Sequence, residues 1–119
     1  MAFFSFIKIM LPKEHLRSNR DFQNVYKTGK SYANKYLVIY VVENGLDVNR
    51  IGISVSKKVG NSVVRHRLTR QLREIYRLHE VVSNSGLDMV IVLRNAAKDK
   101  EYKELESAYL HLGKLHKIM

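Results

Sequence analysis

The sequence predicts an α+β protein, a two-layer α/β sandwich with the element order α-β-β-β-α-β-α. Three stretches carry apolar residues at intervals of three and four positions, which is typical of amphipathic helices. Short runs of β-branched and aromatic residues lie between these stretches and predict strands. The chain has 119 residues, 45% of them hydrophobic, which is enough for one hydrophobic core and not for two.

The first helix is expected from Ser18 to Lys27. Ser18 is a suitable N-cap, Asp21 suits the first turn, and Gly29 follows where helices often end. The apolar side chains of this helix recur at i, i+3 and i+4, so they form one face that consists of Phe22, Val25 and Tyr26.

Two or three strands are expected next. The two that can be placed span residues 36–42 and 51–55, with the turn chemistry of Asn44-Gly45 between them. Two strands joined by a short turn usually form a hairpin, so these strands are predicted to pair antiparallel. In the first strand, alternation separates Leu37, Ile39 and Val41 from a second face of Tyr36, Val38 and Tyr40. One face of the second strand carries only small side chains or none, at Gly52, Ser54 and Ser56. Such a face allows either another backbone or a tightly packed helix to approach closely.

The second half of the chain predicts a helix, a strand and a helix. A long helix is expected over residues 62–80, capped by Asn61 or Ser62. The apolar run 87–93 predicts a central strand that is covered on both faces. Residues 99–117 predict a last helix with a buried stripe of Tyr102, Leu105, Tyr109 and Leu112. Residues 1–15 are expected to be a poorly ordered extension of a single domain that spans 16–119.

The overall charge favours a polyanionic partner. The chain has 21 Lys and Arg against 11 Asp and Glu, a net charge of +10, and an isoelectric point of about 9.9. Cysteine is absent, which excludes disulfides, thiolate metal ligands and a thiol nucleophile, and fits a cytoplasmic protein.

The positive charge is concentrated on the long helix and on the loop before it. A helical wheel places the apolar positions Val64, Leu68, Leu72 and Ile75 on one side. The other side and the loop carry a row of cations with only Glu74 among them: Lys57, Lys58, Arg65, Arg67, Arg70, Arg73 and Arg77. Solvated helix faces usually mix charge signs, whereas a row of like charges repels itself and should be offset by an anion. We therefore favour nucleic acid as the partner over a merely solvated face.

Other functions fit the same residues less well. The elements before the basic helix are strands, not the first helix of a helix-turn-helix DNA-binding motif. A membrane surface is disfavoured because the basic helix also has a face suited to a protein core. No catalytic residue and no metal ligand is predicted, since the five histidines show no ligand spacing and no phosphate-binding glycine loop is present.

Three segments resemble the bacterial ribonuclease P protein component. The segment IGISVSKKVGNSVVRHR (residues 51–67) with Arg73-Glu74 resembles the central signature of that family. Residues 21–29 resemble its first helix, and residues 88–97 its last strand and the turn after it. The match covers about residues 16–115, and residues 16–119 would form a single ribonuclease P protein domain.

The resemblance implies a fold and a function. The fold would have a left-handed βαβ crossover. The protein would be a subunit of ribonuclease P, in which the RNA subunit performs the Mg²⁺-dependent removal of the 5′ leader from precursor tRNA. The protein would bind no cofactor itself and would require no protein partner. The partners it would bind are the RNA subunit and precursor tRNA.

The resemblance also assigns residues to each RNA. The RNA subunit would contact the basic helix and loop, through Lys57, Lys58, Asn61, Arg65, His66, Arg67, Arg70, Arg73 and Arg77. The unpaired leader would lie between the first helix and the sheet, against Phe22, Tyr26, Tyr36 and Tyr40. For Phe22, the apolar pattern favours the core and this groove equally.

The sequence departs from the family pattern at two positions of the basic helix. His66 stands where the family has asparagine, and Thr69 where members usually have a basic residue. Two alternative functions stay open. One is a ribosomal-type or chaperone RNA-binding protein without a catalytic partner. The other is a protein-only nuclease, which is disfavoured because the sequence supplies neither a base nor a metal cage.

Overall fold

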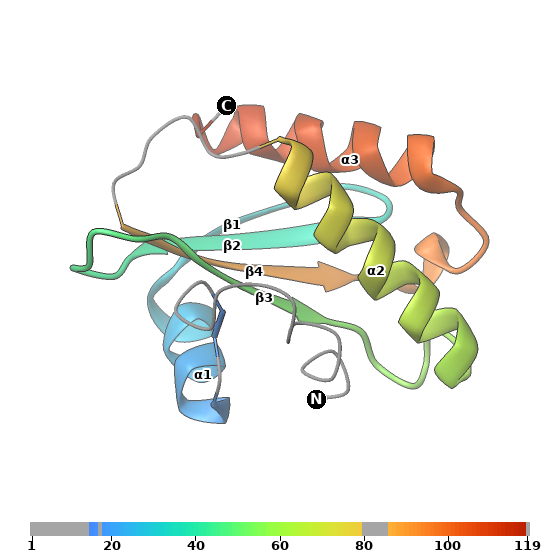
Figure 1. The fold of residues 1–119 in the computed structure, drawn as a ribbon, viewed down its shortest axis with the longest axis horizontal. Coiled ribbons are helices and arrows are strands. Elements are labelled where there is room, and N and C mark those ends of the chain that lie inside the picture. Colours follow the sequence, from blue (N-terminus) through green and yellow to red (C-terminus); the bar gives the residue numbers. More distant parts are fainter. Residues whose placement is uncertain (1–14, 17, 80–85, 119) are drawn as a thin grey trace.

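The structure is a computed structural model that describes residues 15–16, 18–79 and 86–118. Four strands form one sheet in the order β1-β2-β4-β3. Helices α2 and α3 cover one face of this sheet and α1 lies on the other (Figure 1). The elements are α1 (Asn19–Thr28), β1 (Lys30–Ala33), β2 (Leu37–Glu43), β3 (Arg50–Ser54), α2 (Ser62–Leu78), β4 (Leu87–Leu93), the short 3₁₀ helix η3 (Asn95–Ala97) and α3 (Tyr102–Leu115).

β4 is the central strand and holds the sheet together. It pairs antiparallel with β2 from Leu37↔Leu93 to Glu43↔Leu87, and parallel with β3 from Arg50↔Asp88 to Ser54↔Val92. The predicted hairpin between residues 36–42 and 51–55 is therefore wrong, because β4 lies between them. An apolar strand is stabilised by neighbours that hydrogen-bond along both of its edges, and a hairpin would have left β4 at the edge of the sheet.

The connection between β2 and β3 runs around the start of β4. Asn44 accepts a hydrogen bond from the Leu46 backbone, and its amide donates to the carboxylate of Asp88 at 2.8 Å. Arg50 donates to both oxygens of the same carboxylate, at 2.8 and 2.7 Å. Asp88 is buried, so this charge is stabilised only because three donors compensate for lost water.

The crossover from β3 through α2 to β4 is left-handed, as the resemblance implied. In Figure 1, β3 and β4 run in the same direction, β4 lies above β3, and α2 lies on the viewer's side of the sheet. Most parallel crossovers have the opposite hand. The left hand places α2 beside α3 on one face of the sheet.

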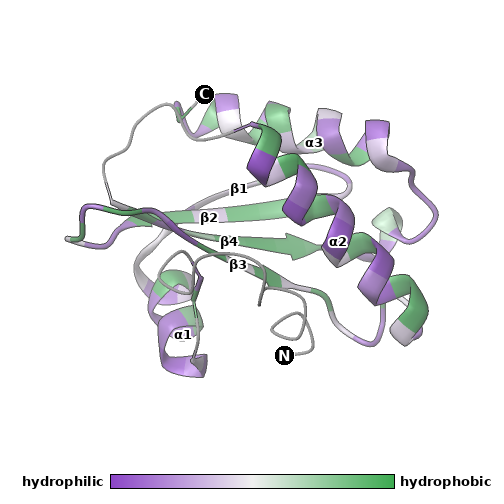
Figure 2. Ribbon diagram, viewed as in Figure 1, coloured by the Kyte–Doolittle hydropathy of each residue, from purple (hydrophilic) through white to green (hydrophobic). Residues whose placement is uncertain are grey.

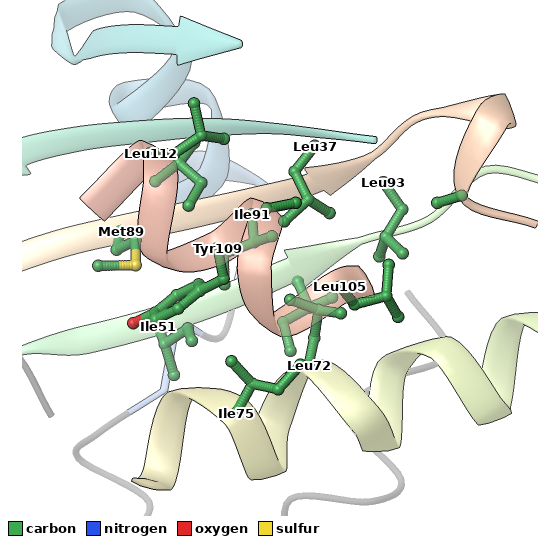
Figure 3. Packing of buried hydrophobic residues seen from close by; sticks show 14 of the residues in the cluster. Leu37, Ile51, Leu72, Ile75, Met89, Ile91, Leu93, Leu105, Tyr109 and Leu112 are labelled. Atoms are coloured by element: carbon green, nitrogen blue, oxygen red, sulfur yellow. The ribbon is translucent and has the colours of Figure 1, made fainter. Parts of the chain in front are cut away.

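The main core lies between this pair of helices and the sheet. Leu72 and Ile75 of α2 and Leu105, Tyr109 and Leu112 of α3 contact the inward residues of β2, β3 and β4 (Figure 3). The core face that was predicted for α2 is confirmed, since Leu68, Leu72 and Ile75 are fully buried and Val64 is partly buried. Figure 2 shows β2 and β4 as mostly hydrophobic, while α2 carries hydrophobic and hydrophilic bands in turn.

A second, smaller cluster attaches α1 to the other face of the sheet. Ser18 caps α1 by accepting from the Asp21 backbone at 3.2 Å, as predicted. Phe22 is buried with Leu16, Val25 and Val90. A methyl group added at Gly52 would lie 2.5 Å from Cζ of Phe22. The bare face of β3 is therefore explained at Gly52 by a tightly packed helix.

The predicted N-terminal extension lies mostly outside the described residues. Residues 1–14 are not described, and their order stays a prediction. His15, the last residue of that extension, is buried and forms a parallel bridge with Ile51, next to the hydrogen bond from Leu16 N to Ile51 O at 3.1 Å.

We expect Gly52→Ala to destabilise the protein by about 1–3 kcal/mol, because the new methyl group would overlap the ring of Phe22. Urea unfolding would measure the change. In a Phe22→Leu background the same substitution should cost clearly less, since the smaller side chain leaves space. Equal costs in both backgrounds would show that the α1 contact does not require glycine.

Candidate nucleic-acid interface

α2 presents its cationic side chains away from the core. Lys57 and Lys58 are exposed in the turn before the helix, and Arg70 and Arg77 are exposed on it. His66, Arg65, Arg67 and Arg73 are partly buried along its flanks. We call these residues, together with Asn61, the α2 basic surface. These are the nine residues that the resemblance assigned to the RNA subunit, and all of them lie on α2 or on the turn that leads into it.

Few carboxylates neutralise this surface. Glu74 accepts two hydrogen bonds from Arg77, at 3.0 and 2.6 Å. These bonds lower the pKa of Glu74 and raise the pKa of Arg77. Among the described residues, no ion pair includes Arg65, Arg67, Arg70 or Arg73. Among the described residues, these four guanidinium groups form no ion pair, and only Arg73 is attracted by the nearby Glu74, so the surface can take an external anion.

Arg67 is different from its neighbours because its donors bind the protein itself. Its guanidinium donates to the backbone carbonyls of Lys98 at 2.7 Å and Lys100 at 3.2 Å, and to Gln71 at 3.3 Å. These bonds attach α2 to the segment between β4 and α3. Arg67 contributes positive charge to the surface, but three of its hydrogen bonds are structural.

Arg65 and Arg73 lie on the flank of α2 that includes Thr69. The Nε atoms of both arginines are buried without a hydrogen-bond partner among the described residues. Burial lowers the pKa of Arg73 from its ordinary value, although a guanidinium stays protonated in proteins. Thr69 is buried and donates to the Arg65 carbonyl at 2.8 Å. The hydroxyl that replaces the family's basic side chain is therefore satisfied inside the helix.

The start of α2 is held by a side-chain cap. Asn61 accepts from the Val64 backbone at 3.0 Å, which confirms it as the N-cap. This cap uses the carbonyl oxygen of the side chain, and the amide nitrogen stays available to a ligand. Val59 is buried between the exposed Lys58 and the helix, so the basic turn is anchored to the core.

The opposite face of the sheet carries a second candidate surface. Tyr26 of α1 and Tyr40 of β2 are both partly buried, and their rings meet edge to face with centroids 5.0 Å apart. Beside them lies a row of partly exposed residues across three strands, in which Val38 pairs with Val92 and Val92 with Ser54. We call these five residues the α1-side platform.

Two residues that were predicted for this second surface do not belong to it. Phe22 is only 2% exposed and packs on Gly52, so in this structure it belongs to the core. Tyr36 precedes β2, which begins at Leu37, and packs against the main core on the side of α3. The strand alternation that placed Tyr36 with Tyr40 does not extend to it. Sequence reasoning missed Val92 and Ser54, which reach the platform only because β4 and β3 are neighbours of β2 in the sheet.

The described residues offer little for metal chemistry. They contain no group of three or more His, Cys, Asp or Glu side chains that could hold a metal ion. Two of the acidic side chains are engaged elsewhere, Asp88 with Arg50 and Glu106 with His79 at 2.7 Å. No helix in this part of the chain combines the length and the hydrophobicity needed to span a bilayer.

Comparisons with known proteins agree with the resemblance. The family model described as Ribonuclease P matches residues 10–117. The ribonuclease P protein component of Lachnoclostridium phytofermentans is 63% identical over 106 residues, which are 89% of this chain and 91% of that protein. The corresponding protein of Alkaliphilus oremlandii is 54% identical over 83% of this chain and 87% of its own length.

Solved structures agree as well. A Staphylococcus aureus RNase P protein mutant, described as defective in mRNA degradation activity, has a TM-score of 0.86 at 35% identity and covers 97% of this chain and 98% of its own. The RNase P protein from Thermotoga maritima has a TM-score of 0.75 at 35% identity, with coverage of 83% and 94%. On its sequence and on its fold, the chain belongs to the ribonuclease P protein family.

Proposed function

We propose that this protein is the subunit of a cytoplasmic ribonuclease P that binds both the catalytic RNA subunit and the 5′ leader of precursor tRNA. Membership of the family implies a subunit of an endoribonuclease holoenzyme. In this proposal the α2 basic surface binds the RNA subunit, and the α1-side platform binds the leader. The observation that carries the proposal is the row of guanidinium groups on α2 without acidic partners among the described residues.

The role of the protein in this proposal is mainly electrostatic. Two RNA molecules that must meet repel each other, and a net charge of +10 screens that repulsion. The charge lies on a rigid helix, because Leu68, Leu72 and Ile75 anchor α2 in the core and Arg67 attaches it to the segment before α3. The helix that carries the arginines is therefore already in place before the RNA arrives.

The α1-side platform suits an unpaired RNA strand. Tyr26 and Tyr40 provide aromatic surface on which bases can stack, and the row of small side chains beside them leaves the sheet accessible. β3 ends at Ser54 in this row, and the basic turn with Lys57 and Lys58 follows three residues later. An RNA strand that leaves the platform at the end of β3 would meet Lys57 and Lys58, the first cations of the α2 basic surface.

The Mg²⁺ of the reaction is assigned to the RNA subunit in this proposal. Within the residues that the structure describes, the acidic and histidine side chains do not form a set of ligands for such an ion. The protein residues bind and orient the RNA, and phosphate groups of the RNA are the natural ligands of Mg²⁺.

A cleavage assay with precursor tRNA tests the function directly. We expect the protein to lower the Mg²⁺ concentration that a bacterial ribonuclease P RNA requires, and to cleave nothing when it is alone. No effect on the cognate RNA would favour a ribosomal-type or chaperone RNA-binding protein. Cleavage by the protein alone would establish a protein-only nuclease.

Replacing Arg70 and Arg73 by alanine should weaken binding of the RNA subunit, because both guanidinium groups lack acidic partners among the described residues. The slope of log affinity against log salt concentration should become shallower by about 0.7–0.9 for each phosphate contact that is lost. Filter binding at several salt concentrations would measure this slope. Lys114→Ala, an exposed cation on α3, serves as the matched control. An unchanged slope in the double variant would exclude α2 as the docking surface.

Tyr40→Ala should weaken precursor tRNA more than mature tRNA, because only the precursor has a leader to stack on the ring. The expected loss is ~1–3 kcal/mol for each stacked base. Binding of both tRNAs to the holoenzyme gives the comparison. Tyr32→Ala is the control, since Tyr32 is a partly buried aromatic residue that packs against the main core. Equal losses for the two tRNAs would remove Tyr40 from the leader site.

A further inference from the structure

A third surface lies between the β1–β2 turn and α3, outside both surfaces described above. Asn34 in this turn makes an unusual number of hydrogen bonds. Its side chain accepts from the backbone of Tyr36 at 3.2 Å and of Leu37 at 3.0 Å, and donates to the Ala108 carbonyl of α3 at 3.0 Å. Its backbone carbonyl accepts from Arg94 at 2.9 Å. The turn and the helix are therefore fixed to each other, and the space between them is preformed.

This space is an open, shallow cleft of about 440 Å³. We call it the Tyr36 cleft. On one side it is lined by the turn, and on the other by residues of α3 that recur at i and i+4 on one flank of the helix: Lys103, Ser107 and His111. The opposite flank of α3 faces α2, since Glu106 pairs there with His79. The cleft therefore lies on the flank of α3 that faces away from α2, and it adjoins the α2 basic surface at Lys100, whose carbonyl accepts from Arg67 at 3.2 Å.

The ring of Tyr36 is surrounded by positive charge. Nζ of Lys35 lies 5.9 Å from the ring centroid and Nζ of Lys100 lies 5.4 Å from it. Lys103 adds a third ammonium group at the wall of the cleft. The one acidic side chain in the lining, Glu104, accepts from the Glu101 backbone in the capping box of α3 and lies 3.7 Å from Lys100. The local charge is therefore positive, and its acidic member is already engaged.

An aromatic ring beside several ammonium groups matches two parts of one ligand. The two ammonium groups lie over the ring, so a nucleobase that stacks on it would replace them, and the displaced lysines could pair with the attached phosphate. An acidic peptide would use the lysines but would leave the ring without a planar partner. We propose that the Tyr36 cleft binds a single unpaired RNA nucleotide, with the base on Tyr36 and the phosphate on Lys35, Lys100 and Lys103.

This site can be tested on the whole isolated protein, without the RNA subunit or precursor tRNA, so its failure would leave the proposed function unaffected. The probe is a 5′-phosphorylated RNA dinucleotide, titrated into ¹⁵N-labelled protein. We expect saturable shifts of the backbone amide signals of Asn34, Lys35, Ser107 and His111. Tyr36→Leu keeps an apolar side chain against the core and should lower the affinity on the order of tenfold, the equivalent of one lost stacking contact. Lys103→Ala should lower it as well.

Two matched variants and two further ligands make the result decisive. Tyr32→Leu replaces another ring that has a lysine near it, Lys30 at 5.1 Å, and Lys114→Ala removes an α3 cation outside the cleft lining. Both variants should bind the dinucleotide like the original protein. The proposal is overturned if these amide signals do not shift, or if Tyr36→Leu binds unchanged. It is also overturned if inorganic phosphate or a pentaglutamate peptide produces the same shifts at the same concentration, since the site would then recognise charge alone.

Discussion

The position of β4 between β2 and β3 is the constraint on which the rest of the structure depends. β4 is apolar on both faces, and it hydrogen-bonds to a neighbouring strand along each edge. Both neighbours of β4 come earlier in the chain. The sheet is therefore complete only when the chain has passed through α2 and β4 has inserted between β2 and β3. The three donors that surround Asp88 then attach the β2–β3 connection to the start of β4. Both candidate RNA surfaces are arranged around this strand.

Charge and apolar surface are strongly separated on α2. The same 17-residue helix has fully buried leucine and isoleucine side chains on one face and a row of cations on the other. A row of like charges destabilises an isolated helix, and here the packing of the apolar face against the sheet and α3 offsets that repulsion. The like charges on α2 therefore repel one another in the free protein, and a bound polyanion would reduce that repulsion. Arg67 reduces this repulsion within the protein itself, because backbone carbonyls accept its protons.

Local signals predicted the elements of the fold well. The run 87–93 was expected to be a central strand and is β4 with the same bounds, since an uninterrupted apolar segment leaves few alternatives. Ser18 was expected as a cap and is one, and of the two candidates Asn61 and Ser62 the structure selects Asn61, because capping needs only the next three residues. Thr69 could be noted as a departure, but only the fold shows that its hydroxyl is satisfied inside the helix.

Non-local relationships were harder to predict. The hairpin prediction failed because the neighbour of a strand is decided by a segment more than 30 residues away, which turn chemistry does not report. Tyr36 was placed on the wrong side because a strand that begins one residue later no longer fixes its direction. Periodicity assigned Phe22 to the apolar face of α1 but could not show how deeply it is buried, since the depth depends on Gly52 of another strand.

The left-handed β3–α2–β4 crossover determines which side of the sheet remains accessible. A connection of the usual hand would carry α2 onto the side where α1 lies, and a 17-residue helix would then compete with the 10-residue α1 for the same strands. With the observed hand, both long helices share one layer, and only a short helix shields the reverse side. The chirality of one connection thus leaves a small chain with two separate accessible surfaces, the outer face of α2 and the sheet face beside α1.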